Sequence, residues 1–377
     1  MLEHLTKFVA SVPEYRRTTK GNYKYKLKDI LMLVILACLS KCITRAEIIQ
    51  FGKHNLKRFQ SMGFLRNGAP SEPTLSRVSN GIDDEMMAGA MAHFTEPFRH
   101  EAPPAEQEIV CIDGKATRGT EYQDGRNPDI VSAYSFHTGL TLATDICDRK
   151  SNEIKSVPKL LDRIDIRGCI VTADAMSFQK AIIDKIRKKG GDFLIELKAN
   201  QRPLRYGVED RIKTMAPSET YNEDTMLSHG RIVTRTCRIY RGEDLIADKG
   251  KWNGNLAVVE ILADTVKKSD GQHTSEQRLY MTSLDADAAR LNLIARRHWS
   301  IECLHWELDR NLKQDSIKRK TERSARNLDT IQRIVLNVIS IWKNRRKKVS
   351  DKKKGIAELV RDISASFTRL LQFLRQK

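Results

Sequence analysis

The spacing of hydrophobic and polar positions changes along the chain, and the first pattern is helical. A mostly apolar run covers Leu27 to Cys42, and Thr44 is placed as the N-cap of the segment that follows it. Residues 66–71 contain Gly and Pro and predict a turn. Ser71 then begins a short helix with an early proline. Residues 1–100 are therefore expected to be helical.

A helix, a turn and a short polar helix suit a helix-turn-helix DNA reader. In that interpretation Ser71, Thr74, Ser76 and Arg77 would face DNA. An ordinary helical bundle with a polar surface fits the same pattern. Arg77 is therefore a candidate DNA contact.

Beyond the Pro-bearing stretch 101–108 the pattern becomes α/β. Apolar, β-branched runs alternate with amphipathic ones, which predicts a mixed sheet flanked by helices. Strands are expected at 107–113, 129–137, 141–148, 168–174 and 192–198, and helices at 153–164 and 177–189.

Short alternating strands dominate from about Tyr221 to Leu284, and the chain is helical and increasingly basic from Ala286. The expected strands here are 231–240, 256–262 and 277–282. The predicted organisation is an N-terminal helical domain at 1–100, a first core part at 105–220, a β-rich insertion at 221–285, core helices at 286–342 and a basic tail at 343–377.

Composition describes a globular, strongly basic chain, with 40% hydrophobic residues, 30% charged residues and a net charge of +18. Such a charge favours a polyanionic partner, and the basic residues of 343–348 and 352–354 would form a phosphate-binding patch. The longest apolar run, Ile30–Leu39, is too short to cross a bilayer. The N-terminus lacks a signal-peptide layout, so we expect a cytoplasmic protein without a membrane partner.

Seven cysteines are scattered singly along the chain. No Cys-x-x-Cys pair occurs, so neither a zinc ribbon nor a disulfide framework is indicated.

Two carboxylates, Asp113 and Asp174, end apolar, β-branched runs, and Glu302 lies inside a helical pattern. Two carboxylates at strand ends and one on a helix suit a two-metal phosphodiester site, because Mg²⁺ prefers hard oxygen ligands. Taken singly, Asp113 could begin a turn, and Asp174 could cap the helix expected near Ser177.

The predicted helix 296–312 places His298, Glu302, His305 and Asp309 along one face. Its packing anchors would come from Trp299, Leu304, Trp306 and Leu308. A solvated charged face and a functional site both fit this stripe. The two histidines are seven residues apart, which suits zinc poorly. An Mg²⁺ or Mn²⁺ pair held by Asp113, Asp174 and Glu302 is the better fit.

Ordered motifs along nearly the whole chain resemble the DDE transposases of bacterial insertion sequences, in particular the H-repeat-associated group. Three of the matching segments are Ile-Asp-Gly-Lys-Ala-Thr-Arg-Gly at 112–119, Thr-Ala-Asp-Ala-Met-Ser-Phe-Gln-Lys at 172–180 and His-Trp-Ser-Ile-Glu-Cys-Leu-His-Trp-Glu-Leu-Asp at 298–309. Two positions depart from the pattern: Val233 replaces an acidic residue, and Cys303 replaces Asn.

The resemblance implies an RNase-H-like α/β core, with Asp113 on its first strand, Asp174 at its fourth and Glu302 on a late helix. It also implies a β insertion before that helix. The expected cofactors are two Mg²⁺ or Mn²⁺ ions. The expected partners are double-stranded DNA at element ends and target, bound by a homo-oligomer associated with the nucleoid.

Several polar residues near the carboxylates are candidate DNA contacts. Lys115 and Arg118 follow Asp113 and could grip phosphates near the cut. The other candidates are Lys198, Asn200 and Gln201 after a strand, His229 and Arg231 on the insertion, and His298, with His305 as a weaker one. Each of them could equally be a solvated surface residue.

The sequence therefore predicts a transposase that cleaves DNA and transfers strands. Three other functions remain open: a DNA-binding regulator with structural carboxylates, a metal-dependent nuclease that never joins strands, and an inactive transposase remnant. A zinc hydrolase of small molecules fits least, because the chain is strongly basic and has no His-rich ligand cluster.

Overall fold

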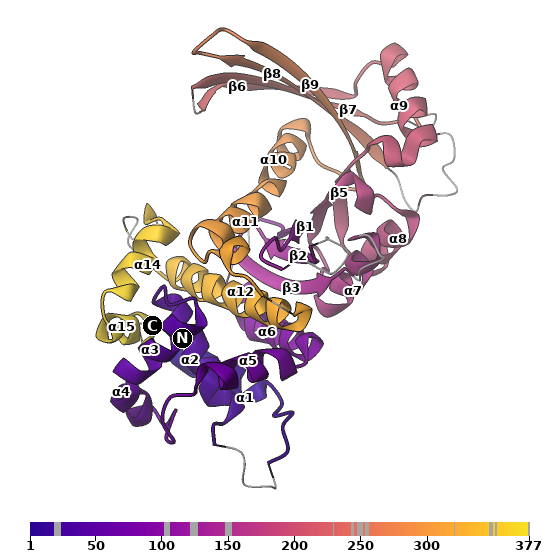
Figure 1. Ribbon diagram of the computed structural model, residues 1–377. Coiled ribbons are helices and arrows are strands. Elements are labelled where there is room, and N and C mark those ends of the chain that lie inside the picture. The colour runs from indigo at the N-terminus through magenta and orange to yellow at the C-terminus, as the bar shows by residue number, and fades with distance from the viewer. Residues whose placement is uncertain are drawn as a thin grey trace. The chain divides into compact units, whose positions relative to one another are not determined.

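The computed structural model describes most of the chain (Figure 1). The described residues are 1–18, 24–101, 106–120, 127–147, 153–228, 230–242, 245–246, 252, 256–319, 321–346, 350 and 353–375.

The chain folds into two compact units, and both are discontinuous in sequence. The first unit contains Met1–Ala102, Gly114–Lys150 and Glu302–Lys377. The second contains Pro103–Asp113 and Ser151–Ile301. The chain therefore passes from one unit to the other directly after Asp113 and directly before Glu302.

The first unit is mainly helical, with two strands. Its helices are α1 (Leu2–Ser11), α2 (Leu27–Leu39), α3 (Arg45–His54), α4 (Leu56–Ser61), α5 (Glu72–Gly81), α6 (Asp84–Arg99), α12 (Glu322–Asn344), α14 (Ile356–Ser364) and α15 (Phe367–Arg375). Its strands β2 (Asp129–Ser135) and β3 (Leu140–Ile146) are antiparallel. Helix α11 (Ser300–Arg310) belongs to this unit from Glu302 onward.

Two long helices organise this unit. The apolar run predicted as a buried helix is α2, which is buried along nearly its whole length. Helix α12 lies on β3, where the fully buried Asn337 accepts a hydrogen bond from the Thr141 backbone N–H (2.8 Å) and donates one to its carbonyl (2.9 Å). Thr44 forms the predicted cap of α3: its hydroxyl accepts from the Glu47 backbone N–H, and the Glu47 carboxylate accepts from the Thr44 backbone N–H. A local sequence signal therefore sets the start of α3, and a buried polar side chain fixes α12 against β3.

The second unit is built on a sheet with helices beside it. Its strands are β1 (Ile109–Ala116, in this unit up to Asp113), β4 (Ile170–Ala173), β5 (Asp192–Glu196), β6 (Glu219–Ser228), β7 (Arg231–Tyr240), β8 (Ala257–Lys267) and β9 (His273–Thr282). Its α-helices are α7 (Ser156–Arg163), α8 (Lys180–Lys188), α9 (Arg202–Thr214) and α10 (Ala288–His298). Short 3-10 helices cover Glu153–Lys155, Ala175–Ser177 and Ala199–Gln201.

Strands β1, β4 and β5 are parallel, whereas β9 pairs antiparallel with β5 and begins an antiparallel set that continues through β8 and β7 to β6. Among the described residues the strand order is β3-β2-β1-β4-β5-β9-β8-β7-β6. The fold is thus mixed α/β with a large mixed sheet, as the sequence predicted. The strands expected after Tyr221 are present as long, curved ribbons (Figure 1).

The single helix predicted over 296–312 is wrong. The structure has two helices there: α10 ends at His298, and α11 begins at Ser300. The Trp299 N–H bonds to the Arg296 carbonyl three residues back (3.3 Å), which closes the last turn of α10. No Pro or Gly marks this break, so the sequence carries no local signal for it. His298 consequently does not share a helix face with Glu302.

Candidate active site

Asp113 and Asp174 come to neighbouring positions through the register of two parallel strands. Ile109 to Ile112 on β1 pair in order with Ile170 to Ala173 on β4. The next residue along β1 is Asp113, after which the strand continues to Ala116, and the residue that follows β4 is Asp174. The two aspartates therefore lie at the same level on neighbouring segments of the chain. Both residues are half-buried. Carboxylates at one level of adjacent parallel strands are a geometry that gathers oxygen ligands.

The capping role considered for Asp174 does not occur in the structure. Asp174 precedes the 3-10 helix at Ala175–Ser177, and its side chain makes no capping hydrogen bond there. The turn is closed instead by the Asp174 backbone carbonyl, which accepts from the Ser177 N–H (2.9 Å). The carboxylate is therefore not committed to capping this turn.

Two amide side chains hold the loop that begins at Asp174. Asn200 donates from Nδ2 to the Ala175 carbonyl (2.7 Å), and Gln201 donates from Nε2 to the Phe178 carbonyl (3.0 Å). Both follow β5, as the sequence predicted for residues near Asp174. The bonds give them a positioning task in this unit, and their contact with DNA stays a prediction.

His298, at the end of α10, lies against β4 near the carboxylate pair. Its Nδ1 shares a hydrogen bond with Oγ1 of Thr172 (3.0 Å), and Thr172 is buried. Burial lowers the pKa of His298 to about 4, even though the Asp174 carboxylate acts in the opposite direction. The imidazole is therefore neutral at pH 7 and is held in place by Thr172.

Glu302 is exposed in the first turn of α11, where a carboxylate interacts favourably with the helix N-terminus. It belongs to the first unit, whereas Asp113 and Asp174 belong to the second. No group of three or more His, Cys, Asp or Glu side chains is arranged to hold a metal ion among the residues that the structure describes. The donor set of Asp113 and Asp174 nevertheless fits Mg²⁺ or Mn²⁺, because both supply carboxylate oxygens.

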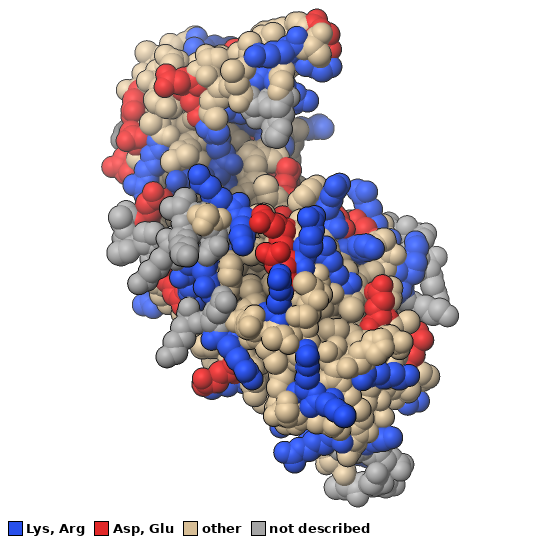
Figure 2. All heavy atoms as spheres, turned by 90° about the vertical axis from the view of Figure 1, so that its left-hand side faces the viewer, with Lys and Arg blue, Asp and Glu red and all other residues tan. Residues whose placement is uncertain are grey.

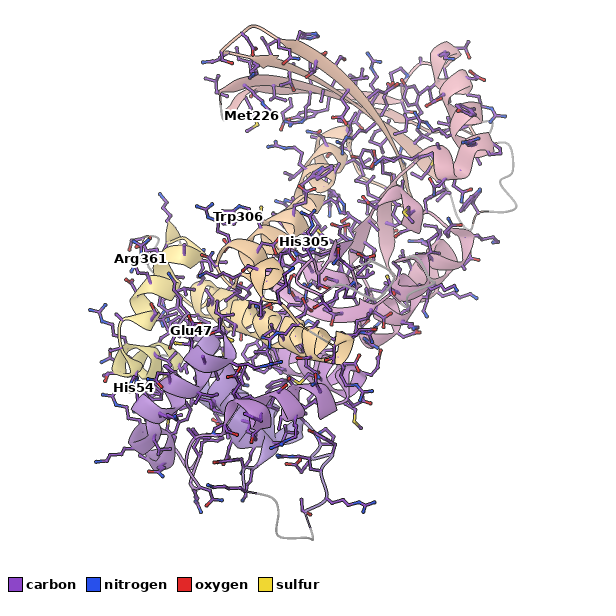
Figure 3. All side chains as sticks on the ribbon, viewed as in Figure 1. Glu47, His54, Met226, His305, Trp306 and Arg361 are labelled. Atoms are coloured by element: carbon purple, nitrogen blue, oxygen red, sulfur yellow. The ribbon has the colours of Figure 1, made fainter. Side chains whose placement is uncertain are left out.

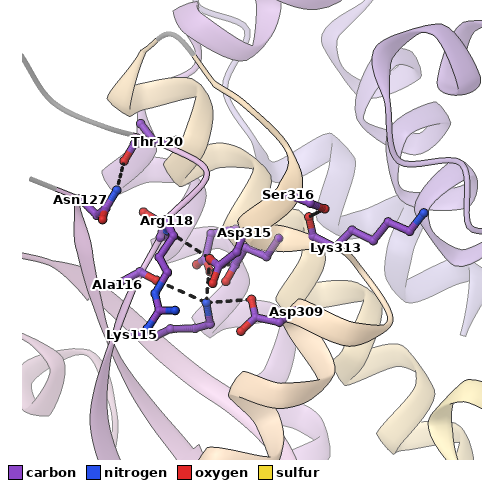
Figure 4. A network of polar contacts seen from close by, with 12 residues as sticks. Lys115, Ala116, Arg118, Thr120, Asn127, Asp309, Lys313, Asp315 and Ser316 are labelled. Carbon is purple, nitrogen blue, oxygen red and sulfur yellow. Dashed lines mark hydrogen bonds and ion pairs between the residues drawn. The ribbon is translucent and has the colours of Figure 1, made fainter. Parts of the chain in front are cut away.

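Lys115, predicted to grip phosphate, is buried and paired (Figure 4). Its ammonium lies 2.9 Å from Oδ1 of Asp309 and 3.1 Å from Oδ1 of Asp315. Arg118 is exposed, and its backbone N–H donates to the same Asp315 oxygen (3.1 Å). Of these two basic residues, Arg118 presents its side chain to solvent.

Three of the remaining predicted DNA contacts are exposed, and a fourth lies outside the residues that the structure describes. Arg77 is exposed on α5, and Arg231 is exposed at the start of β7. Lys198 is exposed and pairs with the buried Glu196 (2.8 Å). His229 lies outside the described residues, as do parts of the basic runs 343–348 and 352–354. Figure 2 shows Lys and Arg side chains spread over much of one face of the molecule.

Two tryptophans expected to anchor the late helix are instead exposed, Trp299 by 40% and Trp306 by 53%, while Leu304 and Leu308 are buried. On α11, Trp306 is exposed and the next-door His305 is half-buried (Figure 3). Of the four predicted anchors, the two leucines therefore pack and the two tryptophans do not.

Sequence reasoning did not find the cavity of about 440 Å³ in the second unit, between β7, β8, β9 and α10. It is lined by Arg235, Arg278 and Arg296 among others, and the Arg278 guanidinium lies 4.6 Å from the ring centre of Trp299. Arg235 and Arg296 both pair with Glu223. The alternation of side chains along each strand does not show by itself that these arginines share one face of the sheet. That becomes clear only when the pairing of β7, β8 and β9 is known.

Within the described part of the chain, no helix has the length and apolar character needed to span a membrane.

Comparison with known proteins identifies two family matches. Residues 104–338 match the family described as "Transposase DDE domain", and residues 6–95 match the family described as "DDE_Tnp_1-associated".

Relatives cover nearly the whole chain. "Putative transposase YncI" of Escherichia coli O157:H7 is 31% identical over 365 residues, which are 94% of this chain and 92% of that protein. "H repeat-associated putative transposase YhhI" of Escherichia coli strain K12 is 30% identical over 90% of this chain and 91% of that protein. The match to a solved "piggyBac transposase synaptic complex with hairpin DNA" covers 100% of this chain and 79% of that chain, with 10% identity and a TM-score of 0.46.

Proposed function

The chain belongs to the family of DDE transposases, and from this premise we propose that it binds the ends of a bacterial insertion sequence and cleaves and joins DNA strands. The observation that carries the proposal is the register of β1 and β4, which brings Asp113 and Asp174 to adjacent positions. The basic charge of the chain supports a DNA substrate.

We propose that Asp113, Asp174 and Glu302 hold two Mg²⁺ or Mn²⁺ ions. Bound ions of this kind activate the attacking oxygen and stabilise the departing oxygen of a phosphodiester. Neighbouring polar side chains orient the segment that carries Asp174. Asn200 and Gln201 fix the loop after Asp174, and Thr172 fixes the neutral His298 beside it.

An RNase-H-like core is supported by the strand order β3-β2-β1-β4-β5, with an antiparallel β2–β3 pair beside parallel β1, β4 and β5. In this proposal β6 to β9 form the insertion before the helix of Glu302. Residues 1–100 would bind DNA, 105–220 and 286–342 would form the catalytic core, 221–285 the insertion, and 343–377 the basic tail.

DNA would be contacted by exposed basic residues on both units. Arg77, Arg118, Lys198 and Arg231 are exposed candidates, and His229, outside the described residues, is a further one. We propose that the protein works in the cytoplasm on nucleoid DNA, as a homo-oligomer that holds the element ends and the target.

The test is an in vitro reaction of the full chain with linear DNA that carries the element ends, a target plasmid, and Mg²⁺ or Mn²⁺. Strand cleavage and covalent appearance of the donor 3′ end in the plasmid are expected. Asp113→Ala should abolish both while DNA binding persists. Cleavage that survives this substitution would contradict the assignment of Asp113.

The rival functions give different results in the same assay. A nuclease would cleave without joining, and a DNA-binding regulator or an inactive remnant would bind without cleaving. Short inverted repeats with a target duplication around the gene would independently support the transposase.

A further inference from the structure

A buried lysine joins two sequence-distant segments of the first unit. Lys115 lies two residues after Asp113 on β1, and it is 8% exposed. It pairs with Asp309, which is on the helix of Glu302, and with Asp315 in the short 3-10 helix at Gln314–Ser316 that follows. Figure 4 shows the ammonium between these carboxylates.

The Lys115 ammonium is buried and held by three oxygen atoms of the protein. A lysine ammonium carries three N–H donors. Lys115 donates hydrogen bonds to Asp315 (3.1 Å) and to the Ala116 carbonyl (3.4 Å), and its ammonium forms an ion pair with Oδ1 of Asp309 at 2.9 Å. A phosphate contact would require breaking one of these contacts in a buried position, which is costly.

The backbone around Lys115 is joined to the same segment. Arg118 donates its N–H to Asp315 (3.1 Å), and the Arg319 N–H donates to the Gly119 carbonyl (3.1 Å). A Cβ at Gly119 would lie 2.5 Å from the Ile317 carbonyl oxygen, so only glycine allows this approach. Residues 115–119 are thus held against 309–319 along their length.

Helix α11 carries both Glu302 and Asp309, seven residues apart and so on one face about 10 Å apart along the axis. Its apolar side is fixed by the buried Leu304 and Leu308. The packing of these leucines and the ion pairs of Lys115 together restrict sliding and rotation of the helix.

We propose that Lys115 is a positioning residue: its ion pairs with Asp309 and Asp315 fix α11, and with it the Glu302 carboxylate, to the end of β1. This inference rests on the proposed function, in which Glu302 is a metal ligand. It also replaces the prediction that Lys115 grips phosphate.

The test compares Lys115→Met and Lys115→Arg with a control that breaks another buried ion pair in the same unit. Arg326→Met is the control, because Arg326 pairs with Asp84 (2.8 Å) and the pair is similarly buried. For each variant we would measure hydrogen exchange of the amides of 302–310, Mn²⁺ binding by calorimetry without DNA, and DNA affinity without metal.

Lys115→Met should speed exchange in α11 and weaken Mn²⁺ binding, each by about tenfold, with DNA affinity unchanged. Lys115→Arg should restore most of the exchange protection and most of the Mn²⁺ affinity. Arg326→Met should change neither the exchange rates of α11 nor the Mn²⁺ affinity. Unchanged exchange and Mn²⁺ binding in Lys115→Met would overturn the proposal, as would a loss of DNA affinity with a smaller salt dependence.

Two further variants keep the test decisive. If Lys115→Met does not fold, Asp309→Asn removes one partner and should shift both readouts in the same direction; unchanged values would overturn the proposal. Glu302→Gln tests the premise separately. Should Glu302→Gln bind Mn²⁺ like the unaltered protein, the metal assignment fails; should it lose Mn²⁺ while Lys115→Met retains it, only the positioning role fails.

Discussion

His298 and Thr172 are joined by a 3.0 Å hydrogen bond between Nδ1 and Oγ1, and Thr172 lies two residues before Asp174. The bond ties the end of α10 to the strand that carries the second carboxylate. Because the imidazole is buried, its charged form is disfavoured, and the pKa of His298 falls to about 4.

Acid should therefore destabilise the protein through His298. The folded pKa, about 4, lies below the ordinary value of 6.5, so the unfolded chain takes up the proton first as the pH falls. Stability is complete above pH 6.5 and is lost toward pH 4, by about 2 kcal/mol between pH 6.5 and 5.

Urea denaturation at pH 7 and pH 5 measures this loss. His298→Gln cannot titrate and should lose less stability over the same interval. An equal loss in the variant would place the titrating group elsewhere. His305, whose pKa burial lowers to about 3, contributes with the same sign in both proteins.

Conservative removal of a single carboxylate charge should stop the chemistry. Asp113→Asn, Asp174→Asn and Glu302→Gln should each reduce strand cleavage by more than about 100-fold, the upper end for residues that only orient a metal ligand. Gel assays of cleavage and of DNA binding check this, with binding expected to persist. Asp165→Asn, on an exposed carboxylate of the second unit that pairs with Arg167 (2.7 Å), is the control and should cleave normally.

Asn200 offers a way to separate positioning from DNA contact. Asn200→Ala removes the bond to the Ala175 carbonyl and should lower cleavage about 10- to 100-fold with DNA affinity unchanged. Lys198→Ala, on the neighbouring exposed side chain, should instead weaken DNA binding and its salt dependence. If Asn200→Ala weakens binding and leaves cleavage of bound DNA intact, Asn200 contacts DNA.

DNA affinity should fall steeply with salt. Binding through phosphates releases counterions, so log affinity declines linearly with log salt concentration. Arg77→Ala should lower the slope by about one if Arg77 touches a phosphate. Arg77→Lys should retain the slope, and fluorescence anisotropy over a salt series gives both. A slope that is flat in the unaltered protein would argue against backbone-dominated binding.

The junction of α12 with β3 should be a major source of stability in the first unit. Asn337→Leu leaves the Thr141 N–H and carbonyl without their partner and should cost roughly 2–4 kcal/mol. Asn344→Ala, which removes one bond to the Thr138 carbonyl (2.7 Å), should cost less. Thermal unfolding ranks the two, and equal effects would contradict the role assigned to Asn337.

Local sequence patterns were enough to predict the strands beside the proposed site. A β-branched apolar run that ends in an aspartate predicts a strand with a carboxylate at its end. Asp174 directly follows β4 as predicted, whereas β1 continues past Asp113 to Ala116. The Thr44 cap and the buried α2 were also predictable, because their signals lie within a few residues. The family followed from ordered motifs along the chain.

Other features depended on partners far away in sequence. Lys115 looked like a phosphate-binding residue next to Asp113, but its partners Asp309 and Asp315 lie about 200 residues further on. The end of α10 at His298 has no local signal, so the predicted stripe was wrong for His298, whereas Glu302, His305 and Asp309 do lie together on α11.

The sequence by itself therefore determined the family, the class of fold and the acidic residues of the proposed site, because each is encoded in short-range periodicity or an ordered motif. Only the tertiary structure decided which of the polar side chains are buried and paired. The burial of a residue depends on which distant parts of the chain pack against it. The sequence near a charged residue is the same whether its side chain lies in water or in an ion pair.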